Sequence, residues 1–167
     1  MKYSAASSIL DTDDDAQLAW AAIEPIWDDL PLSPAKRLRE FLSELEPGQA
    51  ALLAIDWCQK EIRNGGHRQL FGNATGNLVP WAIEGFRLIG AQDYAANLHE
   101  AAIQLGSEYP NSATARKRAI ASLEPARLHH LEDLTDAFLD LLDADQTDLE
   151  RYRGQYVRKN PGQFIQA

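Results

Sequence analysis

The sequence predicts an all-α fold, a compact bundle of seven to eight helices in a single domain. Apolar residues recur every three or four positions along nearly the whole chain, which is the spacing of an amphipathic helix. No stretch shows the alternation of apolar and polar residues that is typical of strands, and no repeat of fixed period indicates a solenoid. A length of 167 residues suits one domain that buries its own core.

Two helices are expected near the N-terminus. Residues 13–30 have helical spacing, with a kink or a break at Pro25, which cannot donate a backbone hydrogen bond. The next helix is expected to begin with Ser33 as its N-cap and Pro34 in the first helical position. Residues 1–46 are therefore predicted to form an N-terminal helical segment that packs on the main domain.

The main domain is predicted to span residues 47–167. Pro47 opens a helix whose run ALLAIDWC is apolar on nearly every side, which indicates the central buried helix. Gly65 is well placed to end this helix as a left-handed cap. Cys58, the single cysteine, lies within the apolar run and is expected to be an inert core thiol.

A helical hairpin is predicted after the central helix. Asn77 is expected to cap its first helix, Gly90 to end that helix, and Gly106 to end the second. A further helix is expected to start at Asn111 or Ser112.

The last two predicted helices follow residue 130. Apolar residues recur at helical spacing from Leu131 to Leu142. Thr147 and Glu150 then have the spacing of a capping box, which predicts a final helix that runs to Pro161.

The overall charge is acidic. The chain has 25 Asp and Glu residues against 16 Lys and Arg residues, a formal net charge of −9. This balance argues against direct binding to nucleic acid or to an anionic membrane, and it favours a basic protein as the partner. The single cysteine and the lack of an apolar membrane-spanning run or leader favour a cytoplasmic location.

The charges are segregated along the chain. Residues 132–150 hold eight carboxylates and no Lys or Arg, and residues 151–167 hold four bases and no carboxylate. A second acidic segment, residues 11–29, holds seven carboxylates and no base. The basic C-terminal segment would weaken the acidic surface if it folded back onto it.

The acidic segment of residues 132–150 is the candidate partner-binding surface. Acidic residues recur every three or four positions opposite the apolar face, so their carboxylates are expected to line one exposed side of a helix. If residues 132–150 continued as one helix, eight charges over steps of about 1.5 Å would give roughly one charge per 3.4 Å, the phosphate rise along one DNA strand. The predicted surface consists of Glu132, Asp136, Asp140, Asp143, Asp145 and Asp148.

Several kinds of site are not supported by their motifs. The glycines in residues 61–77, EIRNGGHRQLFGNATGN, have no Lys-Ser or Lys-Thr after them and no strand before them, so no phosphate-binding loop is predicted. His129 and Asp133 share one helix face, but two ligands do not make a transition-metal site. We expect no cofactor, no metal and no catalytic residue.

The glycine-rich segment also carries a family resemblance. Together with the closing run YVRKNP and Phe164, it resembles a bacterial family of DNA-mimic proteins of largely unknown function, over roughly residues 47–164. The resemblance implies a helical domain without cofactor or catalytic residues, which acts through protein contacts. The motif residues are Asn64, Gly65, Gly66, Gln69, Phe71, Asn73 and Gly76.

The leading hypothesis is a non-enzymatic interaction protein whose acidic surface binds a basic or DNA-binding protein. We interpret the glycine-rich segment as structural, with glycines that turn the chain and with Gln69 and Asn73 satisfying backbone groups. The oligomeric state stays open, a homodimer included.

Two alternatives remain open at this stage. The first is an immunity or inhibitor module that uses aromatic anchors. The second is an enzyme that uses residues 64–76, with His67 as general base assisted by Arg68 or Asn73. The candidate anchors are Trp20, Trp27, Trp57 and Trp81.

Overall fold

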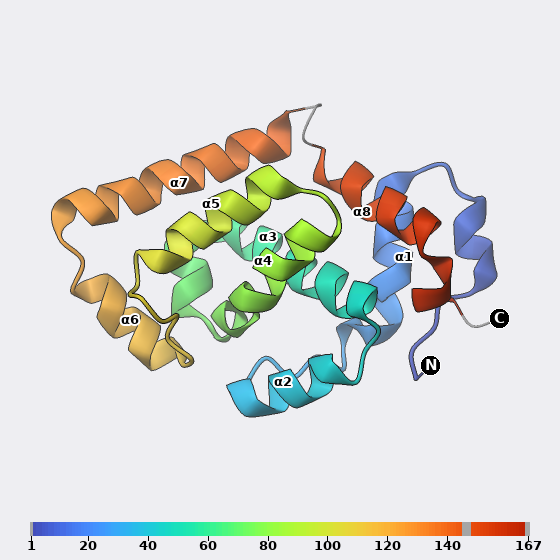
Figure 1. Ribbon diagram of the computed structural model, residues 1–167, viewed down its shortest axis with the longest axis horizontal. Coiled ribbons are helices and arrows are strands. Elements are labelled where there is room, and N and C mark those ends of the chain that lie inside the picture. The colour runs from blue at the N-terminus through green and yellow to red at the C-terminus, as the bar shows by residue number, and fades with distance from the viewer. Residues whose placement is uncertain (1, 145–147, 166–167) are drawn as a thin grey trace.

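The computed structural model describes residues 2–144 and 148–165, and within these ranges the fold is all-α, with eight α-helices, no strand and one compact body (Figure 1). The predicted fold class is confirmed. The helices are α1 (Asp15–Trp27), α2 (Ala35–Ser43), α3 (Pro47–Gly72), α4 (Val79–Leu88), α5 (Gln92–Ile103), α6 (Ala113–Ala121), α7 (Pro125–Asp143) and α8 (Leu149–Lys159). The described residues also form the short 3-10 segments η1 (Ser7–Asp11), η2 (Ala74–Leu78) and η4 (Pro161–Gln163).

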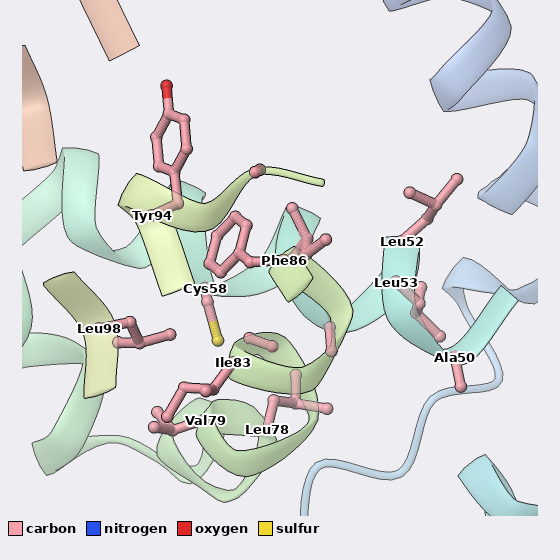
Figure 2. Close-up of a cluster of buried hydrophobic side chains, with 14 of the residues drawn as sticks. Ala50, Leu52, Leu53, Cys58, Leu78, Val79, Ile83, Phe86, Tyr94 and Leu98 are labelled. Atoms are coloured by element: carbon pink, nitrogen blue, oxygen red, sulfur yellow. The ribbon is translucent and has the colours of Figure 1, made fainter. Parts of the chain in front are cut away.

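Helix α3 is the central buried helix, as predicted. It begins at Pro47, behind a capping box formed by Glu46 and Gln49. Cys58 points into a cluster of apolar side chains from α3, α4 and α5 (Figure 2), and its burial raises the pKa of the thiol far above its usual range. The prediction of an inert core thiol is therefore confirmed.

Helices α4 and α5 form the predicted hairpin against α3. Gly90 and Gly106 follow the two helices with positive φ angles of 84° and 140°, which favour glycine. Gly85 brings α4 close to α3, because a Cβ added there would lie 3.1 Å from the backbone of Ala51. Tyr94 points away from the shared cluster toward α7 (Figure 2).

The two ends of the chain meet. Helix α8 packs beside α1 (Figure 1), so closely that a Cβ added at Gly154 would lie 2.4 Å from a carboxylate oxygen of Asp15. The same carboxylate pairs with Arg158 at 3.3 Å. Near the termini, Ala5 and Ile165 form an isolated parallel β-bridge.

Two predicted helix starts are wrong. Pro34 has extended backbone angles, follows a cis peptide bond and is itself the N-cap of α2, so Ser33 is not the cap. Asn77 does not cap α4, because its side-chain amide donates instead to the carbonyl of Leu32, 2.9 Å away. The second error has a tertiary cause, since Leu32 lies beside Asn77 of η2.

Other predicted starts are confirmed or fall partly outside the described residues. Ser112 caps α6, and its hydroxyl accepts from the amide of Ala115 at 3.2 Å. Thr147 lies outside the described residues; the N-cap of α8 is Asp148, whose carboxylate accepts from the amide of Glu150.

A buried ion pair joins α8 to α3. The guanidinium of Arg153 lies 3.0 Å from the carboxylate of Asp56, and both side chains are almost fully buried, at 2% and 4% exposure. Arg153 also pairs with Glu150 at 2.9 Å, and Asp56 pairs with Lys60 at 2.7 Å. Buried charges without partners are costly, so this network fixes the position of α8.

We expect Asp56→Ala to lower the free energy of unfolding by about 3 kcal/mol, because Arg153 would stay buried with one carboxylate fewer. Glu40→Ala is the control, since it breaks only the exposed pair with Lys36 and should cost at most about 0.5 kcal/mol. Urea unfolding measures both variants. Equal losses would show that the buried pair has no special role.

Candidate protein-binding surface

The glycine pair of the motif bends α3 instead of ending it. Gly65 and Gly66 have non-helical backbone angles, and the helix then resumes and runs to Gly72. The prediction of Gly65 as a C-terminal cap is therefore wrong; the positive φ of 72° belongs to Gly66. A Cβ at Gly66 would also lie 2.9 Å from the side chain of Thr135, so α7 passes close to the bend.

The carboxylate of Glu61 accepts hydrogen bonds from three polar side chains of the glycine-rich segment. Gln69 donates to it at 2.8 Å, Asn73 at 3.2 Å and Thr75 at 2.8 Å. Gln69 and Asn73 therefore bind a side chain and not the backbone groups that we expected. The reason is that residues 67–72 are helical and satisfy most of their own backbone hydrogen bonds.

Arg116 on α6 locks the end of this segment and was not identified from the sequence. Its guanidinium is buried and donates to the carbonyls of Phe71 at 2.7 Å, Asn73 at 2.9 Å and Pro110 at 3.0 Å. Gly76 allows this approach, because a Cβ there would lie 2.7 Å from the Arg116 Nε. No spacing rule distinguishes Arg116 from the neighbouring bases of α6.

His67 is a buried core residue. Its ring lies 5.9 Å from that of Phe71 and 5.8 Å from that of Phe138, and its Nδ1 lies 2.9 Å from the hydroxyl oxygen of Thr135. Burial lowers the pKa of His67 to about 4, against an opposing effect of Asn97. A fully buried imidazole cannot reach a substrate, so the mechanism with His67 as general base loses its support.

The lowered pKa gives a testable pH dependence. Below its ordinary pKa of 6.5, His67 takes up a proton in the unfolded chain but not in the folded protein, so stability falls as the pH falls toward 4. Between about pH 7 and about pH 5, wild type should lose about 2 kcal/mol more than His67→Leu in urea unfolding. A parallel loss in wild type and in His67→Leu would contradict this role.

Helix α7 is held in one orientation by contacts with α5. The side-chain amide of Asn97 donates to the carbonyl of Leu134 at 2.9 Å, and the hydroxyl of Tyr94 donates to the carbonyl of Leu141 at 2.8 Å. Leu131 and Phe138 are fully buried beneath the helix. The opposite face of α7 is consequently fixed toward solvent, along one edge of the molecule (Figure 1).

The outward face of α7 carries the predicted carboxylates. Glu132, Asp136, Asp140 and Asp143 are all exposed, at spacings of four, four and three residues. Their 11 helical steps of about 1.5 Å give roughly one charge per 5.5 Å. The spacing of 3.4 Å counted every carboxylate on one continuous helix over residues 132–150, and that condition is not met, because α7 ends at Asp143 and α8 begins as a separate helix at Leu149.

Two bases from α3 reach the ends of this stripe. Arg68 lies 3.5 Å from Glu132, and Arg63 lies 3.7 Å from Asp143. Both pairs are exposed and are therefore weak. Asp136 and Asp140, in the middle of the stripe, have no ion-pair partner among residues 2–144 and 148–165.

A comparison with protein families matches residues 43–160 of the chain, more than two thirds of its length. The chain belongs to the DMP19-like protein family. This is the DNA-mimic family that the motif resembles, and the matched residues begin and end four positions before the predicted limits. No curated protein and no solved structure matches the chain. Helix α1 lies outside the match.

In this DMP19-like chain two of the C-terminal bases pair away from the stripe. Arg153 pairs with Asp56 and Glu150, and Arg158 pairs with Asp15. These carboxylates belong to α1, α3 and α8. Arg153 and Arg158 therefore do not neutralise the acidic face of α7.

The remaining predicted residues of the acidic surface and of the family motif lie in different environments in the DMP19-like chain. Asp148 is exposed but already accepts a hydrogen bond as the N-cap of α8. Asp145 lies outside the described residues. Asn64 is exposed just before the bend in α3, and Phe71 is buried under it.

The described residues offer neither a metal-binding cluster nor a membrane-spanning helix. No group of three or more His, Cys, Asp or Glu side chains within residues 2–144 and 148–165 is arranged to hold a metal ion. Across the same ranges, every helix is too short or too polar to cross a membrane.

Proposed function

We propose that the chain binds a basic, DNA-binding protein through the acidic face of α7. The contact residues are those that occupy the outward face of the helix, with the N-cap carboxylate of α8 next to them and Asp145 between the two helices in the sequence. The proposed surface consists of Glu132, Asp136, Asp140, Asp143, Asp145 and Asp148.

The observation that carries this proposal is the unpaired centre of the stripe. Asp136 and Asp140 are exposed and have no ion-pair partner in the described part of the chain, while Arg153 and Arg158 of the C-terminal segment pair with carboxylates outside α7. Like charges four residues apart on a helix repel and destabilise it. Carboxylates without a compensating base at these positions therefore favour a role in binding a partner. A row of exposed carboxylates offers the charge that a DNA-binding surface attracts.

Family membership supports the same function. The DMP19-like family is a family of DNA-mimic proteins, and a mimic acts through protein contact without a cofactor or a catalytic step. The net charge of −9 disfavours nucleic acid itself as the ligand.

The test is retention of basic proteins on the immobilised chain at low and at high salt. DNA-binding proteins from a bacterial lysate should be retained at low salt and released by salt, because exposed charges are screened. Retention that survives high salt would instead favour an interface built on apolar anchors. Failure to retain any basic protein at low salt would refute the proposal.

A further inference from the structure

Three tryptophans gather where α1 crosses α3. The rings of Trp27 and Trp57 are stacked, with centroids 4.4 Å apart and planes at 8°. Trp20 meets Trp27 edge-on at 5.2 Å. Trp20 keeps 38% of its surface exposed, an unusual fraction for a large aromatic side chain. The cluster therefore ends in an indole that is partly open to solvent.

This cluster already holds a cation. The ammonium of Lys60 lies 4.9 Å from the ring centroid of Trp20 and 4.2 Å from that of Trp27. Asp56 holds the same ammonium at 2.7 Å and compensates its charge. The rings are thus arranged for cation–π contacts, and Lys60 does not leave an uncompensated charge that would repel a second cation.

Two carboxylates lie near Trp20 on the solvent side of α1, those of Glu24 and Asp28. Trp20 and Glu24 lie four residues apart on one face of the helix, and Asp28, the C-cap residue that follows it, comes four residues further along. Glu24 and Asp28 are exposed and have no ion-pair partner among the described residues. All three positions lie outside residues 43–160, so the family match does not account for this surface.

We infer that this face of α1 is a second contact surface, on which Trp20 stacks with an arginine side chain of the basic partner while Glu24 and Asp28 pair with its charge. The inference rests on the proposed function in one respect, which is that the partner is basic. Arginine fits better than lysine because its planar guanidinium can stack on an indole and pair with a carboxylate at the same time. Because Trp20 already packs against Trp27, its side chain loses little conformational freedom on binding.

The inference can be tested with two labelled peptides, hexa-arginine and hexa-lysine, whose binding to the full chain is followed by fluorescence anisotropy. Wild type should bind hexa-arginine about fivefold more tightly than hexa-lysine, the advantage expected from stacking on one indole. Trp20→Leu, which keeps an apolar contact with Trp27, should abolish this preference. Glu24→Gln with Asp28→Asn should weaken binding of both peptides several-fold.

The double variant Asp136→Asn with Asp140→Asn separates this inference from the proposed function. It should weaken binding of both peptides and leave the preference for arginine unchanged, since the face of α7 is not aromatic. If Trp20→Leu retains the preference, the second surface is refuted, whatever the α7 variant does. If the α7 variant binds both peptides as wild type does, the proposed function is refuted, but the second contact surface on α1 is not. If Trp20→Leu does not fold, unchanged binding by the exposed variant at Glu24 and Asp28 overturns the inference.

Discussion

Replacement of Arg116 by alanine should lower the free energy of unfolding by about 4 kcal/mol or more, because buried carbonyls that lose a charged donor keep their full desolvation cost. Three backbone carbonyls and the side-chain oxygen of Asn77 accept from this one guanidinium. Its ring contact with Tyr109, 5.6 Å from the centroid, would also be lost. The whole turn from the end of α3 into η2 depends on these contacts.

Two further variants make this prediction specific. Arg118→Ala removes an exposed base from the same helix and should change stability by at most about 0.5 kcal/mol. Arg116→Lys keeps the charge but cannot reproduce the fork of donors, so it should recover only a small part of the loss. Urea unfolding is the measurement. An Arg116→Ala protein as stable as Arg118→Ala would contradict the role assigned to Arg116.

The double variant Asp136→Asn with Asp140→Asn should bind the basic partner about tenfold to a hundredfold more weakly at low salt, because it removes the two carboxylates that have no intramolecular ion pair. The same variant should be slightly more stable than wild type, by about 0.3 to 0.5 kcal/mol, since it relieves repulsion between positions i and i+4. Weaker binding with unchanged or higher stability excludes unfolding as the cause.

The matched control is Glu40→Gln with Glu44→Gln at α2. It changes the net charge by the same amount at exposed positions on the opposite edge of the molecule from α7 (Figure 1). Binding by this control should fall by no more than about twofold, the effect of net charge alone. If the two double variants weaken binding equally, the partner responds to total charge and not to the stripe on α7.

Local signals predicted much of the fold. Pro47 as a helix start, Ser112 as an N-cap and Gly90 as a helix end are all confirmed. The apolar run around Cys58 identified the central helix, because a helix that is apolar on every side has to be buried. These features depend on residues that are close in the sequence, and sequence patterns record such relations directly.

The errors concern contacts between distant residues. The bend at Gly65 and Gly66 looked like a helix end because glycines normally break helices, yet residues 67–72 after it are helical. Their helical state depends on Glu61, which binds Gln69 and Asn73, and on Arg116 from α6. The pairings of Glu61 and Arg116 have no sequence periodicity, so only the folded structure identifies them.

The candidate surface was partly predictable. The helical spacing of Glu132, Asp136 and Asp140 predicted a row of exposed carboxylates, and all three are exposed. The pairing of Arg153 and Arg158 with carboxylates outside α7 could not be predicted, because it joins helices that are distant in the sequence. The use of this surface by a partner remains a proposal.

The most direct test of DNA mimicry is displacement of duplex DNA from a basic protein that the immobilised chain retains. Labelled duplex DNA is bound to that protein at low salt, and the chain is titrated into the complex. We predict that wild type releases the DNA and that Asp136→Asn with Asp140→Asn releases it only at concentrations about tenfold higher or more. Release of DNA by both proteins at the same concentration, or no release by wild type, would contradict the proposal that the face of α7 occupies a DNA-binding surface.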